Sequence, residues 1–168
     1  MNIFFLHHTP QIAALFHCDK HVVKMIVETA QLLATAHHEH GNGANVTYKP
    51  THKNHPSAIW ARESRLHYMY LVDLGKSLCK QFRLRYGHDH KTRDLFFGEL
   101  MDPPPALSKL PSTWRNPPQC MPDECKDADT VKAYRNYYRW KQNVMTMAWY
   151  RNANNYMPDF MRDDHAYA

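Results

Sequence analysis

The chain of 168 residues has 21 lysines and arginines against 16 aspartates and glutamates, and 43% of its residues are hydrophobic. These values suit one folded domain (1–168) and exclude disorder, collagen-like repeats and low complexity. No run approaches the roughly 20 apolar residues of a membrane helix, and the opening MNIFFL lacks the basic region of a signal peptide. We therefore expect a compact, soluble, cytoplasmic protein with no membrane partner and with its four cysteines reduced.

Positive charge is concentrated in the first part of the chain. Residues 1–119 hold fourteen lysines and arginines against nine acids, whereas residues 120–168 hold seven of each. Twelve of the thirteen histidines also precede residue 91. A basic surface attracts phosphates, so DNA or a nucleotide is the leading partner class, and ordinary solubility charge is the alternative.

Two long helices are expected in the first half of the chain. Apolar residues recur at helical spacing from Cys18 to His38, where Asp19 can be an N-cap or an acid in the first turn. A glycine- and asparagine-rich loop follows. A second helix should run from Pro56 to Tyr86, bend near Gly75 and stop at Gly87.

The second half is expected to combine an extended segment with a third helix. Residues 101–122 contain seven prolines, so they can form neither a helix nor a central strand and should lie extended over the helices. A helix from Asp129 to Arg151 should follow and bury Tyr134, Tyr138, Met145 and Trp149. The predicted fold is mainly α: a compact single-domain bundle of about three long helices with a Pro-rich extended segment packed across it.

Five polar residues should share one face of the first helix. His17, His21, Lys24, Glu28 and Gln31 follow one another at steps of 4, 3, 4 and 3 residues. Such a stripe can be a solvated surface, on which an ion pair is worth about 0.3–0.5 kcal/mol. The stripe begins, however, with histidines, whose pKa values change readily with their surroundings, and such side chains are typical of a reactive site.

The cations of this stripe suggest amine chemistry. Lys20, His21 and Lys24 lie within about one helical turn, and neighbouring positive charge lowers the pKa of an amine. A DNA N-glycosylase with lyase activity needs such an amine to attack the anomeric carbon of the sugar, and a carboxylate to assist it. Glu28 is the matching carboxylate. The candidate catalytic residues are Lys24, Glu28, His21, Lys20 and His17.

A second set of residues could contact nucleic acid. Aromatic and imidazole rings can wall a pocket for an extruded base, while arginines and lysines bind phosphates. One group follows the His-rich loop, one ends the second helix, and one lies on the third helix. The candidates are His55, Trp60, Arg62, His67, Arg83, Arg85, Lys91, Trp114, Tyr137 and Lys141.

The histidines also allow a metal hypothesis. The patterns H-C-x-x-H at 17–21 and H-H-x-H at 37–40 place donors close together, but no complete zinc motif is present. We therefore assign no metal and no other cofactor. A metal-dependent nuclease or nucleotide hydrolase remains an alternative function, as does a non-enzymatic module that binds nucleic acid or a host protein.

Short motifs over about the first ninety residues resemble the pyrimidine-dimer DNA glycosylases of phages and bacteria. They are MNIFFL, the basic and acidic first helix, Asn54-His55-Pro56, Tyr70-Leu71 and the run RYGHDHK at 85–91. The resemblance implies a mostly helical, metal-free enzyme that flips a nucleotide out of the duplex. It also implies a Schiff base through the amine exposed after methionine removal, and a carboxylate on the first helix.

Two further features of the sequence affect what the resemblance implies. Asn2 is a poor residue for methionine removal, so the reacting amine could be that of Met1, Lys20 or Lys24. The string HCDKHVVKMIVETAQLL also resembles uncharacterised proteins of phage genomes. If this chain is phage-encoded, we expect it in the host cytoplasm.

Overall fold

The computed structural model describes residues 1–162, and in this range all regular structure is helical. The mainly α fold is confirmed. The α-helices are α1 (Pro10–Phe16), α2 (Asp19–Glu39), α3 (Pro56–Ala61), α4 (Arg65–Tyr86), α5 (Arg93–Phe97) and α6 (Thr130–Lys141). Short 3₁₀ turns occupy Gly43–Asn45, Leu107–Lys109, Asp123–Cys125, Ala153–Asn155 and Asp159–Met161.

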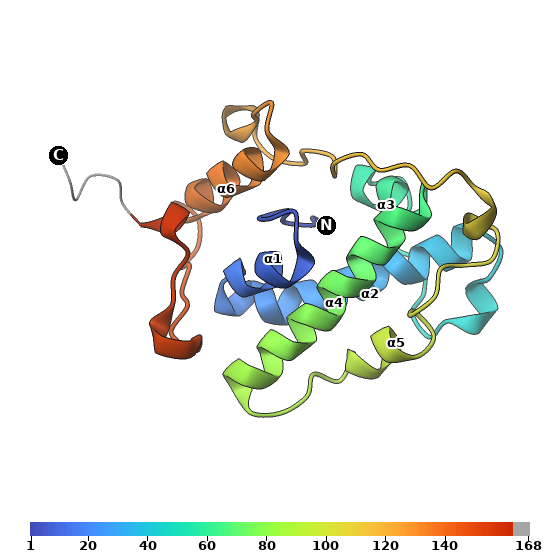
Figure 1. Ribbon diagram of the computed structural model, residues 1–168, viewed down its shortest axis with the longest axis horizontal. Helices are drawn as coiled ribbons and strands as arrows, with labels where there is room; N and C mark the ends of the chain where they lie inside the picture. The colour runs from blue at the N-terminus through green and yellow to red at the C-terminus, as the bar shows by residue number, and fades with distance from the viewer. Residues whose placement is uncertain (163–168) are drawn as a thin grey trace.

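The two long helices α2 and α4 pack against each other and form the centre of the domain (Figure 1). Helix α1 also packs on α4. The apolar faces of both long helices are buried between them, which removes a large nonpolar area from water. Within residues 1–162, no helix combines the length and apolarity needed to cross a membrane.

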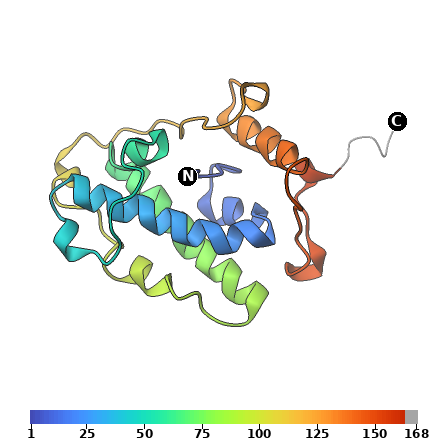
Figure 2. The same cartoon turned by 180° about the vertical axis from the view of Figure 1, so that it is seen from behind.

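The N-terminal segment lies in the middle of the molecule and is surrounded by α1, α3 and α6 (Figures 1 and 2). Residues Ile3 to Leu6 are fully or almost fully buried. Phe4 has a φ of 52°, in the left-handed region that non-glycine residues rarely adopt. This turn reverses the chain locally, and the backbone N–H of Leu6 donates to the carbonyl of Phe4 at 2.8 Å.

The expected second helix is in fact two helices. The chain leaves the helical conformation after Ala61, and α4 starts anew with Ser64, whose hydroxyl accepts a hydrogen bond from the N–H of Leu66 at 3.2 Å. Helix α4 continues without interruption through Gly75, where the missing side chain makes room for the ring of Phe96. The expected stop at Gly87 is confirmed, with a φ of 79°.

The third helix starts as predicted but is shorter. Asp129 caps α6 by accepting from the N–H groups of Val131 and Lys132, and the helix ends at Lys141 instead of Arg151. After Lys141 the part of the chain that the structure describes is not an α-helix, and tertiary contacts fix its position. One of them is a hydrogen bond from the Trp149 indole N–H to the Phe16 carbonyl at 3.0 Å. Tyr134, Tyr138 and Trp149 are buried as expected, and Met145 is half-buried.

The Pro-rich segment 101–122 runs across the outside of α3 and α4 towards α6, mostly without regular structure (Figure 1). The indole N–H of Trp60 donates to the Arg115 carbonyl at 2.9 Å, and the Arg115 N–H donates to Nε2 of His67 at 3.0 Å. Leu107 is buried, whereas Trp114 is 42% exposed. The expected extended, packed segment is therefore confirmed.

Candidate active site

A polar cavity of about 190 Å³ lies where the N-terminal segment, α2 and α6 meet. We call it the polar hollow. It brings together three residues of the predicted stripe on α2 with residues from four other parts of the chain. Its lining residues are Met1, Asn2, Phe4, His21, Lys24, Glu28, His55, Cys120, Tyr137 and Lys141.

Glu28 and Lys24 form the expected i,i+4 ion pair on α2. Their charged atoms are 3.3 Å apart, and the exposed side-chain fraction is 68% for Lys24 but 16% for Glu28. The carboxylate is therefore held inside the hollow, while the Lys24 ammonium lies mostly in solvent.

His21 is an uncharged group in the wall of the hollow. Its ring stacks on Phe4, with centroids 4.5 Å apart, and its Nδ1 lies 2.8 Å from the Tyr138 hydroxyl. The same hydroxyl accepts from the N–H of Cys18 at 3.2 Å, and its own proton is available to an unprotonated Nδ1. Burial, followed by nearby positive charge, lowers the pKa of His21 to about 3. His21 can thus donate or accept a hydrogen bond, but it does not add the positive charge expected from the sequence.

Lys141 brings a second amine into the hollow from α6. Its Nζ lies 5.0 Å from the ring centroid of Tyr137 and 5.7 Å from that of Phe4. Burial, and then the positive charge of Lys24, lowers the pKa of Lys141. The sequence assigned this side chain to nucleic-acid contact and expected a perturbed amine at Lys20 or Lys24. Lys20 is exposed and does not line the hollow.

His55 closes the side of the hollow next to Met1. Its Nδ1 accepts from the Ser57 N–H at 3.1 Å, so the side chain caps the start of α3. Burial, followed by the positive charge of the N-terminal amine, lowers the pKa of His55, and Glu28 opposes this shift. Asn2 fixes the segment by donating to the Cys120 carbonyl at 2.9 Å.

His17 lies behind the hollow, completely buried. Its Nδ1 donates to the Ala13 carbonyl at 2.6 Å, and its Nε2 has no hydrogen-bond partner. Burial lowers the pKa of His17 to about 4. Because α2 begins only at Asp19, His17 precedes that helix and does not continue its polar face. Of the five candidate catalytic residues, His17 and Lys20 therefore do not line the polar hollow.

Three of the predicted nucleic-acid contacts are buried parts of the scaffold. Trp60 and His67 stack with ring centroids 4.3 Å apart and hold the Pro-rich segment through Arg115. Arg85 is buried and pairs with Asp19 at 3.1 Å. These side chains are not available to a base or a phosphate, which corrects their predicted placement on a binding surface.

The other predicted contacts are spread over separate surfaces. Tyr137 lines the polar hollow from α6. Arg62 donates to the Lys53 carbonyl at 2.7 Å in the His-rich loop. Trp114 lines an apolar groove of about 470 Å³, and Lys91 lines a separate cavity of about 380 Å³.

Three residues of the hollow were not identified from the sequence. Asn2 and Phe4 belong to an apolar N-terminal stretch that is typical of a core strand or turn, and Cys120 lies in the Pro-rich segment. Asn2 and Phe4 lie in the MNIFFL motif of the resemblance, but no role was assigned to either residue, and Cys120 lies in none of those motifs. Only the way distant segments pack places them beside Glu28.

The histidine motifs do not assemble a metal site in the part of the chain that the structure describes. Residues 1–162 contain no group of three or more His, Cys, Asp and Glu side chains placed to hold a metal ion. The histidines of the 37–40 motif have separate partners: His37 the Tyr68 hydroxyl, His38 the Tyr48 carbonyl and His40 the Arg62 carbonyl. The metal-dependent alternative thus lacks a ligand set there.

Comparisons with known proteins identify no relative of this chain. No protein-family model matches the chain, and searches of curated proteins and of solved structures found no similar protein.

Proposed function

We propose that the chain is a DNA base-excision enzyme, an N-glycosylase with Schiff-base lyase activity, and that the polar hollow is its active site. The observation that carries the proposal is the convergence of the Glu28 carboxylate with the amines of Lys24 and Lys141 in one cavity. An amine and a shielded carboxylate are the two groups that this chemistry requires.

The reaction begins at the amine. An uncharged amine forms a bond to C1′ of the deoxyribose while the bond from C1′ to the base breaks, and the base leaves with the bonding electrons and takes up a proton from water. The attached amine then loses one proton, the ring oxygen O4′ gains one as the bond from C1′ to O4′ breaks, and an iminium ion is formed. Removal of a proton from C2′ then expels the 3′ phosphate, and water hydrolyses the imine to free the enzyme.

Lys141 is the favoured nucleophile, because burial and the nearby charge of Lys24 lower its pKa and so raise the fraction of uncharged amine. Lys24 and the N-terminal amine are the other amines at the hollow. Glu28 is placed to stabilise positive charge on the sugar and to accept the proton from C2′. The half-buried ring of Tyr137 provides an aromatic surface of the kind that contacts an extruded base.

Borohydride trapping tests the proposal, because it reduces the imine to a stable covalent bond between enzyme and DNA. The substrates are duplexes that contain an abasic site or a pyrimidine dimer. We expect a covalent adduct whose tryptic peptide carries the sugar on Lys141. The variant Lys141→Ala should lose the adduct, whereas Lys132→Ala, an exposed lysine on the same helix, should retain it.

Two outcomes separate the parts of the proposal. An adduct that maps to Lys24 or to the N-terminal amine keeps the glycosylase and replaces the nucleophile. The absence of an adduct with every substrate, from folded protein, rejects the enzyme.

A further inference from the structure

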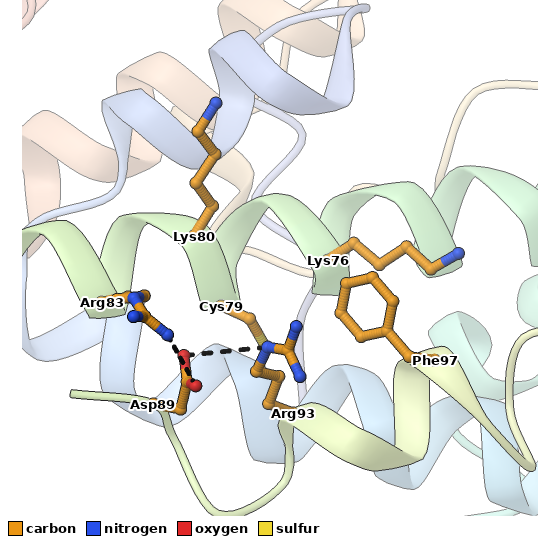
Figure 3. Close-up of a pocket in the computed structure, with 7 residues that line it drawn as sticks. All are labelled: Lys76, Cys79, Lys80, Arg83, Asp89, Arg93 and Phe97. Atoms are coloured by element: carbon orange, nitrogen blue, oxygen red, sulfur yellow. Dashed lines mark hydrogen bonds and ion pairs between the residues drawn. The ribbon is translucent and has the colours of Figure 1, made fainter.

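A second charged cavity of about 190 Å³ lies between α4 and α5, formed by residues outside the polar hollow. We call it the basic hollow. Four of its seven lining side chains are cations and one is a carboxylate. Figure 3 shows the lining residues Lys76, Cys79, Lys80, Arg83, Asp89, Arg93 and Phe97.

The cations form a row along one helix face. Lys76, Lys80 and Arg83 follow one another at steps of four and three residues on α4, so they lie on the same side of that helix. Arg93 faces them from α5. In Figure 3 the Lys76 side chain runs beside the ring of Phe97, and the Lys80 side chain points away from Asp89.

Asp89 holds the two arginines in place. Its carboxylate lies 2.9 Å from Arg83 and 3.7 Å from Arg93 (Figure 3). The Phe97 ring, 48% exposed, adds cation–π contacts to Lys76 at 5.1 Å and Arg93 at 4.5 Å. The guanidinium groups are thus oriented before any ligand binds.

The ion pairs do not neutralise this hollow. Among residues 1–162, neither Lys76 nor Lys80 forms an ion pair, so the two lysines add their full charge to the arginines around Asp89. Arg93 has one more partner, Asp94, whose side chain is almost fully in solvent. Such a surplus of cations on a concave surface attracts an anion.

We propose that the basic hollow binds the phosphate backbone of duplex DNA. The row from Lys76 to Arg83 spans about 10 Å at 1.5 Å per residue, and phosphates of one strand advance about 3.4 Å each along the duplex. Because the strand also winds around the axis, its phosphates are farther apart than this advance, so three cations over this length can contact neighbouring phosphates, whereas one small anion reaches only part of the row. The choice of DNA over another polyanion rests on the proposed function.

The test is a fluorescence polarisation titration of a labelled, undamaged 20-base-pair duplex at several salt concentrations, with the full chain. The double variant Lys76→Ala/Lys80→Ala removes two charges from the hollow without breaking an ion pair. Its matched control, Lys49→Ala/Lys109→Ala, removes two charges from exposed positions elsewhere. We expect the first variant to bind roughly tenfold more weakly at ~0.1 M salt, with a salt slope smaller by about 2.

Three results would overturn the inference: no binding by the wild type, unchanged binding by the hollow variant, or equal weakening by both double variants. Trapping with the hollow variant at saturating protein separates this inference from the enzyme proposal. An adduct together with unchanged affinity rejects the basic hollow alone. The expected loss of affinity, without an adduct from any protein, rejects the glycosylase alone.

Discussion

The polar hollow and the basic hollow have the same volume, but their charged side chains differ in exposure to solvent. In the polar hollow a shielded carboxylate, an uncharged imidazole and a partly buried amine lie among aromatic rings. In the basic hollow, lysines and arginines surround one carboxylate at the surface. Burial changes proton affinity, whereas solvated cations keep their charge. The first cavity is therefore suited to proton transfer and the second to holding an anion.

The two cavities also differ in how the chain builds them. The basic hollow comes from residues 76–97, two consecutive helices and the turn between them. The polar hollow needs the N-terminal segment, α2, the residue before α3, the Pro-rich segment and α6. Damage to the core should thus disturb the polar hollow more than the basic one.

The largest predicted effect is a difference in stability between two arginine variants. The sequence grouped Arg83 and Arg85 as one cluster of nucleic-acid contacts, whereas the structure buries only Arg85. Arg85→Met leaves the carboxylate of Asp19 buried without its partner, which should lower the free energy of unfolding by about 3–5 kcal/mol. Arg83→Met, two residues earlier on the exposed side, should change it by less than about 0.5 kcal/mol. Urea unfolding measures both. Equal losses would contradict the distinction between scaffold and surface.

Glu28→Gln tests the reactive character of the polar hollow. Removing the charge of this carboxylate should reduce single-turnover base release or strand cleavage roughly 10²–10³-fold. DNA binding, measured by fluorescence polarisation, should stay within about twofold, because phosphate contacts supply most of the affinity. Glu39→Gln, an exposed glutamate on the same helix, should leave turnover unchanged. A small effect of Glu28→Gln would remove this residue from the mechanism.

Acidification should destabilise the wall of the polar hollow. Burial lowers the pKa of His17 to about 4 and that of His21 to about 3, below their value in the unfolded chain. The unfolded state therefore binds protons first as the pH falls below about 6.5, so stability present at pH 7 is lost towards pH 4. We expect each histidine to cost about 2 kcal/mol at pH 5.

Urea unfolding at pH 7 and pH 5 measures this loss. His17→Phe fills the same space without a titrating group, so it should reduce the difference between the two pH values by about 2 kcal/mol. An unchanged difference would mean that His17 is not held uncharged.

The smallest effect should come from the basic hollow. Asp89→Asn removes the one carboxylate among its lining residues and frees the charge of Arg83 and Arg93. Affinity for duplex DNA should rise by roughly two- to fivefold, with a steeper salt dependence. Asp123→Asn is the control, because it removes an exposed carboxylate paired with Lys126 elsewhere. A similar rise in both variants would indicate net charge alone.

The candidate site was predictable where it follows one helix. His21, Lys24 and Glu28 lie on one face of α2 because helical spacing alone places them there, and all three line the same cavity. His17 breaks the pattern, since the chain is extended at residues 17 and 18, between α1 and α2. No pattern in the sequence around Lys141 predicted that its amine would lie in the candidate site. The residues that surround this amine come from the N-terminal segment and α2, which are distant in the sequence.

The sequence by itself determined the mainly α fold, the start of α2, the stop at Gly87 and the extended Pro-rich segment. These depend on hydrogen bonds, backbone limits and apolar spacing among neighbouring residues. Tertiary structure alone decided where α6 ends, which arginine is buried, and that the N-terminal segment and α6 meet at Glu28. Packing between distant segments sets burial, and burial sets the charge and accessibility of each side chain.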